Sequence, residues 1–239
     1  MADLFGDAVR DWMAREHAPL VIERDDGYMD EQDLDSYFSA FDSFPECEKA
    51  ALGLARGRVL DIGLGPGRVS LHLQGMGLEA VGVDISDDML EVARRRGVRN
   101  AVRMSACDLR FPRGHFQTAV AFGNNFGLCG TPEAVMSMLL RLREVVSDDG
   151  VFLAQSIDPL ATEKPEHLMY HERNRSAGRM PGQVKLRFMY RGAVGDWFDL
   201  LMVTPTEMAE LAEKTGWRVS ETFGAPDAGY LRVYALRKA

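Results

Sequence analysis

Residues 58–68 read Arg-Val-Leu-Asp-Ile-Gly-Leu-Gly-Pro-Gly-Arg, and this stretch decides the fold. Val59, Leu60 and Ile62 form the short apolar run that a buried parallel strand requires. Three glycines follow at alternate positions, and an apolar-periodic helix then begins near Val69. Glycines in such a turn let the backbone approach a ligand closely, and the start of the next helix presents unpaired N–H groups. The stretch therefore predicts a strand–turn–helix unit that binds a ligand.

The spacing of the glycines separates two kinds of cofactor site. A dinucleotide fingerprint requires Gly-x-Gly-x-x-Gly or Ala, but Arg68 occupies its last position here. The pattern Asp-x-Gly-x-Gly-x-Gly, formed by Asp61, Gly63, Gly65 and Gly67, instead resembles motif I of the class I S-adenosylmethionine (SAM)-dependent methyltransferases. The resemblance implies an α/β fold with a Rossmann-like doubly wound sheet, mostly parallel with an antiparallel C-terminal edge strand. It also implies SAM as the cofactor and S-adenosyl-L-homocysteine (SAH) as the product.

Later segments agree with this resemblance. The apolar run 80–85 contains Asp84, and an acid at that strand end can accept hydrogen bonds from both ribose hydroxyls. In the family, an acid at the position of Asp108 commonly accepts from the adenine amino group, although a solvated loop aspartate is the alternative. The strand in 116–122 leads into a loop that we expect to touch the methionine part of SAM. The expected cofactor-binding residues are Asp61, Gly63, Gly65, Gly67, Asp84, Ile85, Cys107, Asp108, Leu109, Gly123 and Asn124.

Composition and charge limit the class of protein. At 239 residues one α/β domain is expected, and the net charge of −8 argues against a nucleic-acid partner. The chain has no apolar run that could span a bilayer and no leader, so we expect a cytoplasmic protein without a membrane partner. Cys47, Cys107 and Cys129 read as three scattered thiols rather than a disulfide framework, with Cys107 as a small buried hydrophobe.

The chain is expected to form a single domain with two additions to the cofactor-binding core. The first addition precedes the glycine turn and shows helical periodicity, which predicts a helical cap. The second follows the fifth core strand, and its latter half has the alternation of a β-hairpin. The expected parts are a helical cap (1–55), the SAM-binding core (56–157), an inserted lid with a hairpin (158–203), and a C-terminal helix with an edge hairpin (204–239).

Opposite charges in the two additions suggest a lid. Residues 23–35 carry seven acids against one arginine, and residues 164–191 carry seven bases against two glutamates. Taken singly, most of these charges fit a solvated face. Taken together, they predict a lid whose acidic and basic parts meet above the acceptor pocket.

The expected catalytic residues are His171, Tyr170 and Asn125. His171 is the candidate base, which is needed only if the acceptor must lose a proton, and a structural histidine is the alternative. Asn125 lies in the loop expected between the cofactor and the acceptor. His167 and His171 are four residues apart, but no further ligand completes a metal set, so no metal is expected.

Two function classes remain open at this point. The first is a SAM-dependent methyltransferase that acts on N, O or C of a small molecule by in-line displacement, with a homodimer left open as its assembly. The second is a non-catalytic SAM-fold binding protein or a nucleotide-dependent oxidoreductase. Arg68 argues against the oxidoreductase.

Overall fold

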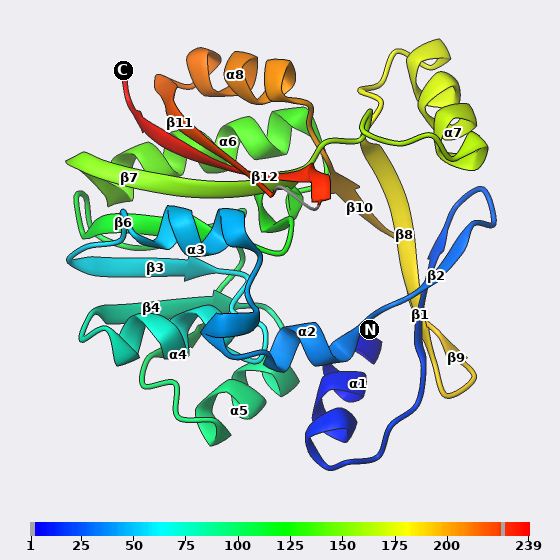
Figure 1. Ribbon diagram of the computed structural model, residues 1–239, viewed down its shortest axis with the longest axis horizontal. Coiled ribbons are helices and arrows are strands. Elements are labelled where there is room, and N and C mark those ends of the chain that lie inside the picture. Colours follow the sequence, from blue (N-terminus) through cyan, green and yellow to red (C-terminus); the bar gives the residue numbers. More distant parts are fainter. Residues whose placement is uncertain (1–2, 226–227) are drawn as a thin grey trace.

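Two β-sheets organise the chain: a seven-stranded sheet that carries the glycine turn, and a smaller sheet that stands opposite the ends of its strands (Figure 1). The computed structural model describes residues 3–225 and 228–239. The seven strands follow the order β11-β12-β7-β6-β3-β4-β5, and β12 lies antiparallel between β7 and β11 while the other pairs are parallel. This confirms the Rossmann-like fold. The strands are β3 (Arg58–Ile62), β4 (Glu79–Asp84), β5 (Ala101–Arg103), β6 (Phe116–Ala121), β7 (Val146–Ile157), β11 (Trp217–Ala225) and β12 (Ala228–Lys238).

Helices cover both faces of the seven-stranded sheet. One apolar core joins the sheet to α6 and α8, and a second joins its other face to α3 and α4. Because both faces are covered, the central strands are almost fully buried. In the part of the chain that the structure describes, no helix is long and apolar enough to cross a membrane. These helices are α3 (Glu46–Leu52), α4 (Arg68–Gly75), α5 (Asp87–Arg95), α6 (Pro132–Val145) and α8 (Pro205–Lys214), with short 3₁₀ turns at η1 (Phe41–Ser43) and η2 (Asn125–Gly127).

Local sequence signals set the helix starts. The Ser86 hydroxyl accepts from the N–H of Met89 and caps α5, as its position before two aspartates predicts. Thr204 and Glu207 form a reciprocal capping box at the start of α8, with a proline at the first helical position. These starts fix where each helix leaves the carboxyl end of the preceding strand.

The second sheet, which we call the lid sheet, combines strands from both additions. Its order is β10-β8-β1-β2, with β9 paired to β8. The central pairing joins β1 to β8 in antiparallel register, from Leu20 opposite Tyr190 to Arg24 opposite Leu186. Its elements and the helices beside it are α1 (Leu4–Met13), β1 (Leu20–Arg24), β2 (Met29–Glu31), α2 (Leu34–Phe38), α7 (Pro165–Ser176), β8 (Gln183–Tyr190), β9 (Ala193–Val194) and β10 (Phe198–Leu201).

The N-terminal addition differs from the helical cap that the sequence predicts. The hairpin expected in the second addition is present as β8 and β10. The N-terminal part, however, supplies β1 and β2 as well as helices, and α2 covers only five residues. The reason is long-range pairing, because β1 gains its strand partner from the inserted hairpin, far along the sequence. The two additions therefore form one structure.

Opposite charges of the two additions meet within the lid sheet. The Glu23 carboxylate pairs with Arg187 at 2.6 Å, and Asp25 pairs with Arg173 at 2.7 Å. Tyr170 donates its hydroxyl to the same Asp25 carboxylate at 2.7 Å. These contacts join strand β1 and its turn to β8 and α7. The acidic and basic segments are thus partners rather than separate solvated faces.

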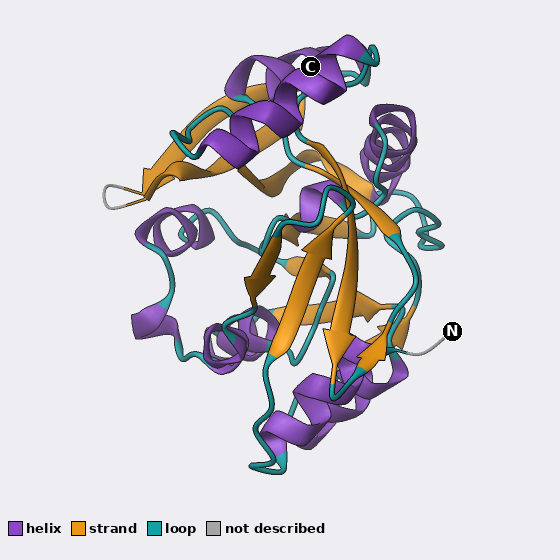
Figure 2. Ribbon diagram, turned by 90° about the vertical axis from the view of Figure 1, so that its right-hand side faces the viewer, coloured by secondary structure: helices purple, strands orange, loops and turns teal. Residues whose placement is uncertain are grey.

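Helix α1 attaches the lid sheet to the core. It packs between α5 and β8, and Arg10 reaches Asp88 at the start of α5 at 2.6 Å. Figure 2, which turns the right-hand side of Figure 1 toward the viewer, shows the lid strands in front of the seven-stranded sheet. The lid is therefore anchored at one side through an apolar helix contact.

Two of the three cysteines are joined, which corrects the prediction of separate thiols. Cys107 and Cys129 form a disulfide with their Cα atoms 5.8 Å apart, while Cys47 is free and buried. Cys107 is exposed, so the expectation of a small buried hydrophobe is also wrong. The bridge links the loop after β5 to the loop after β6. The sequence could not show this, because nothing local reveals that these two loops meet.

Reducing this disulfide should lower the free energy of unfolding. The bridge closes a loop of 22 residues, and such a crosslink stabilises by about 3 kcal/mol through the unfolded chain. Urea unfolding with and without a phosphine reductant measures the difference. The double variant Cys107→Ser/Cys129→Ser is the control and should not respond to the reductant. An equal free energy of unfolding for the wild type in both conditions would contradict the prediction.

Candidate functional site

The glycine turn between β3 and α4 combines an open position with a closely packed one. Gly65 has φ +52°, and a side chain built there would meet no atom within 4 Å. Gly67 has φ +86°, and a Cβ atom there would lie 2.5 Å from Val98. Gly67 is thus needed for close packing of the turn against the region after α5. Gly65 leaves the backbone accessible to a ligand.

Asp84 closes one side of this turn. One oxygen of its carboxylate accepts from the N–H of Gly65 at 2.8 Å, and the other accepts from Ser86 N–H at 3.0 Å. Burial raises the pKa of Asp84, although the backbone donors oppose this rise. The next side chain, Ile85, is exposed to 68%. The Asp84 carboxylate, which can accept from hydroxyl groups, and the exposed apolar side chain of Ile85 therefore lie together beside the glycine turn.

Asp61 lies beneath the turn and is almost fully buried. Its carboxylate accepts from the Ser70 hydroxyl of α4 at 2.7 Å. Burial raises the pKa of Asp61 to about 7, with the Ser70 hydrogen bond and the nearby Arg68 charge acting in the opposite direction. The structure therefore places Asp61 as a support between β3 and α4.

The loop after β5 carries the expected adenine contact at the surface. Asp108 is exposed and accepts from the Arg110 side chain at 2.9 Å, which lowers the pKa of Asp108. The Leu109 side chain is buried in the core, and its carbonyl accepts from Arg141 at 2.6 Å. The disulfide fixes the neighbouring Cys107. Of the three predicted residues in this loop, Cys107, Asp108 and Leu109, Asp108 is the one with an exposed charged side chain.

The loop after β6 is tied to the glycine turn through Asn125. The amide nitrogen of Asn125 donates to the carbonyls of Ile62 and Gly63, at 3.0 and 2.9 Å. Gly63 carries no side chain, and a Cβ atom there would collide with this amide. The expected catalytic Asn125 therefore holds the two loops together.

Asn124 is the buried polar residue of this loop with an unused donor. Its φ is +63°, a left-handed conformation that is uncommon outside glycine. Its side-chain oxygen accepts from the N–H of Ile157 at 3.0 Å, while its amide nitrogen is buried without a partner. A buried donor without a partner costs free energy, and a ligand acceptor would recover it. Asn124 thus fits a ligand-binding position.

The structure places Tyr170 and His171 on α7, within the lid. The Tyr170 hydroxyl donates to Asp25 and accepts from Lys185 N–H at 3.2 Å. His171 is 4% exposed, and its Nδ1 atom has no hydrogen-bond partner. Burial, together with Arg175, lowers the pKa of His171. Figure 1 shows α7 at the outer end of the lid, apart from the glycine turn between β3 and α4, so the structure does not bring these two residues to that turn.

Arg96, at the end of α5, is a site residue that the sequence did not reveal. Its guanidinium donates to the Pro66 carbonyl of the glycine turn at 2.6 Å and to the Phe38 carbonyl of α2 at 3.2 Å. It also lies over the Phe38 ring, 4.8 Å from its centre. Arg96 thus joins the turn to the N-terminal addition. It belongs to a run of three arginines, and nothing in that run distinguishes the one that points inward.

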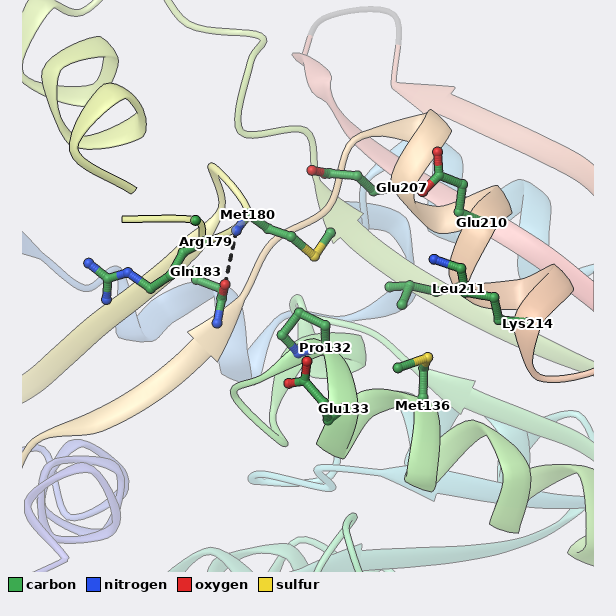
Figure 3. A pocket seen from close by; sticks show the side chains of 11 residues that line it. Pro132, Glu133, Met136, Arg179, Met180, Gln183, Glu207, Glu210, Leu211 and Lys214 are labelled. Atoms are coloured by element: carbon green, nitrogen blue, oxygen red, sulfur yellow. Dashed lines mark hydrogen bonds between the residues drawn. The ribbon is translucent and has the colours of Figure 1, made fainter. Parts of the chain in front are cut away.

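A pocket of about 510 Å³ lies elsewhere, between α6, α8 and the segment before β8 (Figure 3). Charges of both signs line it, and it contains none of the residues that the sequence predicts for the site. The glycine turn and its neighbouring loops therefore remain the candidate site. The residues that line the pocket are Pro132, Glu133, Met136, Gly178, Arg179, Met180, Gln183, Glu207, Glu210, Leu211 and Lys214. Within residues 3–225 and 228–239, no group of three or more His, Cys, Asp or Glu side chains could hold a metal ion.

Comparisons with known proteins find similarity to methyltransferases. The sequence model of a family described as a methyltransferase domain matches residues 59–150. A SAM-dependent methyltransferase from Bacteroides fragilis, solved with SAH, is 27% identical, with a TM-score of 0.83 over 99% of this chain and 95% of that one. No curated protein sequence matches the chain.

Two further solved structures share the fold at lower identity. The CcbJ methyltransferase from Streptomyces caelestis is 20% identical, with a TM-score of 0.63 over 84% of this chain and 99% of that one. The 1,6-didemethyltoxoflavin-N1-methyltransferase from Burkholderia thailandensis, with bound 1,6-didemethyltoxoflavin and SAH, is 21% identical. Its TM-score is 0.52 over 80% of this chain and 74% of that one.

The raised pKa of Asp61 predicts a pH-dependent stability. Its folded pKa of about 7 lies above the ordinary value of 3.8. The folded state therefore binds the proton more tightly, so the free energy of unfolding falls as the pH rises above 3.8 and levels off above about 7, by up to a few kcal/mol in all. Asp61→Asn keeps an acceptor for Ser70 but removes the titration. Urea unfolding at pH 5 and pH 8 should thus favour the variant over the wild type at pH 8, whereas parallel pH curves would contradict the assignment.

Proposed function

Because this chain belongs to the class I SAM-dependent methyltransferases, we propose that it transfers the SAM methyl group to a nitrogen, oxygen or carbon atom of a small-molecule acceptor. The observation that carries this proposal is the glycine turn, which is open at Gly65 and bonded to Asp84. The family match decides against a nucleotide-dependent oxidoreductase. SAM supplies an activated methyl group and leaves as SAH.

We propose that the turn and the neighbouring loops hold the cofactor. The Asp84 carboxylate keeps lone pairs beyond its two backbone bonds, and these can accept from ribose hydroxyls. Ile85 would lie against the adenine, and Asp108 would accept from its amino group. The open backbone at Gly65 and the unused donor of Asn124 would face the methionine part. The donors, acceptors and space of this chain thus fit SAM.

A row of aromatic rings in the lid supports a small-molecule acceptor. Tyr37 packs edge-on against Phe5, which contacts Phe188, which stacks on Phe198, with ring centres 4.9–5.2 Å apart. All four side chains are half-buried. The row runs from α2 to β10, and its first three rings belong to the apolar cluster that α1 forms with the lid sheet. We propose that it borders the acceptor, because aromatic faces attract both cations and planar rings. The bound 1,6-didemethyltoxoflavin of the Burkholderia enzyme is a precedent for a small-molecule acceptor.

The proposed chemistry relies on alignment and exclusion of water. Methyl transfer by in-line displacement requires the acceptor atom to be held close to the methyl group. Asn125 serves this by fixing the loop after β6 to the glycine turn. For His171 we keep the proposed role of proton acceptor, because its Nδ1 atom has no hydrogen-bond partner. Since the side chain is buried on α7, apart from the glycine turn, that role requires a lid movement that exposes it and brings α7 toward the cofactor. Tyr170 would move with α7, because its partner Asp25 also belongs to the lid.

Asp84→Ala should weaken SAM binding. Each hydrogen bond to a charged group contributes about 1.5–3 kcal/mol, so we expect affinity to fall by about tenfold or more. Calorimetric titration with SAM and SAH measures the change. Asp87→Ala is the matched control, because that acid lies three residues away and is exposed. Unchanged affinity in a folded Asp84→Ala protein would refute the proposed ribose contact.

The lid should become more protected when the cofactor binds. The ion pairs of Glu23 and Asp25 join the two additions to each other and not to the core, so they do not hold the lid over the glycine turn. A bound cofactor would add contacts between the lid and the core. Amide hydrogen exchange of residues 23–41 and 165–191 should slow when SAH is added. Helix α8 (Pro205–Lys214) serves as the internal control and should be unaffected. Equal exchange of the lid in both states would leave it as a static structural element.

A further inference from the structure

A buried glutamate connects three elements around the cofactor turn. Glu48 of α3 is 2% exposed. Its carboxylate accepts two hydrogen bonds from the Arg68 guanidinium, at 2.7 and 3.0 Å, and a third from the Gln155 amide at 2.8 Å. Arg68 is the first residue of α4, directly after the glycine turn, and Gln155 lies near the carboxyl end of β7. A buried charge must be paired, and here a two-pronged arginine pairs it.

Gln155 links Glu48 to the loop after β6. Its side-chain oxygen accepts from the backbone N–H groups of Gly123 and Asn124, the latter at 3.3 Å. Glu48 can only accept and the backbone N–H groups can only donate, so the Gln155 amide has a single satisfactory orientation. The charge on Glu48 thus determines which end of Gln155 faces the loop. This loop contains the left-handed Asn124 with its unused donor.

We propose that Glu48 is a positioning residue for methyl transfer, acting through Arg68 and Gln155. This inference rests on the proposed function. Glu48 holds the start of α4 and the loop at residues 123–125 in one fixed relation, so that both sides of the methionine subsite keep their geometry. Arg68 is further fixed by the Phe44 ring, 4.3 Å from its guanidinium carbon. The arginine that breaks the dinucleotide fingerprint therefore has a structural use of its own.

The network makes a specific prediction for a swap of its two side chains. Glu48→Gln keeps one acceptor oxygen and no charge, so its NH₂ group faces either an Arg68 N–H or the Gln155 NH₂ group. The chain of hydrogen bonds from Arg68 to the Gly123 N–H is then broken at one of these two contacts. Gln155→Glu alone sets two carboxylates against each other. In the double variant Glu48→Gln/Gln155→Glu, the carboxylate at position 155 accepts from the Gly123 and Asn124 N–H groups and from the amide at position 48. The total charge is kept, and Arg68 retains one of its two hydrogen bonds to position 48. We expect each single variant to loosen the loop at residues 123–125, and we expect the double variant to restore its order.

Two measurements test this, and one of them needs no ligand. Amide exchange of Gly123 and Asn124 in the ligand-free protein should accelerate about tenfold or more in Glu48→Gln and recover in the double variant. SAH affinity, measured by calorimetry, should fall about tenfold and recover in the same way. Glu46→Gln is the matched control, since Glu46 lies on the same helix and is 64% exposed. Arg68→Lys, which loses the two-pronged contact, gives a second test if Glu48→Gln fails to fold.

The outcomes distinguish a failure of the Glu48 network from a failure of the proposed function. Faster exchange and weaker SAH binding, both recovered by the swap, support the inference. Glu48→Gln that behaves like Glu46→Gln, or a double variant no better than the singles, overturns it. If the wild type binds no SAH, the proposed function fails, while the exchange measurement still decides whether the network holds the loop.

Discussion

The hydrogen bond from the Gly65 N–H to the Asp84 carboxylate is the contact on which the cofactor side of the molecule depends. It joins the turn after β3 to the end of β4, and it forms because the two strands are parallel neighbours. Because Gly67 has no side chain, the turn packs closely against Val98, and the Gly65 N–H lies within hydrogen-bond distance of Asp84. Arg96 binds the same turn from the other side, because its guanidinium donates to the Pro66 carbonyl. Elements that approach the cofactor are thus placed relative to a turn that is held on two sides.

The lid depends on a different kind of interaction. Its two halves come from distant parts of the chain, and backbone pairing of β1 with β8 joins them. Charged pairs such as Glu23 with Arg187 then add specificity, since like charges at those positions would repel. The lid meets the core through α1 at one side and through the approach of β10 to the η2 turn at the other. The main resistance to lid movement is therefore apolar packing, which salt does not weaken.

The sequence predicted what local patterns determine. The strand–turn–helix unit and the acid ending β4 follow from periodicity and glycine spacing, and the structure has both. Strands β1 and β2 and the disulfide of Cys107 were missed, because each depends on a partner that lies elsewhere in the sequence.

The candidate site shows the same limit. The position of Asn125 could be predicted, but its contact with Ile62 and Gly63 could not, because an amide serves equally as a catalyst and as a backbone clamp. Glu48 carried no signal either. A glutamate in a short helix reads as a surface residue, and only the fold shows that Arg68 and Gln155 surround it.

The pairing of β1 with β8 also sets the order in which the chain can fold. During synthesis β1 emerges well before β8, since Leu20 lies far ahead of its partner Tyr190 in the sequence. Until then the strand is an unpaired edge, which is a template for aggregation with other copies. The aspartates and glutamates of residues 23–35 lie directly beside it. Charged side chains beside an unpaired strand oppose such association, because like charges on neighbouring chains repel.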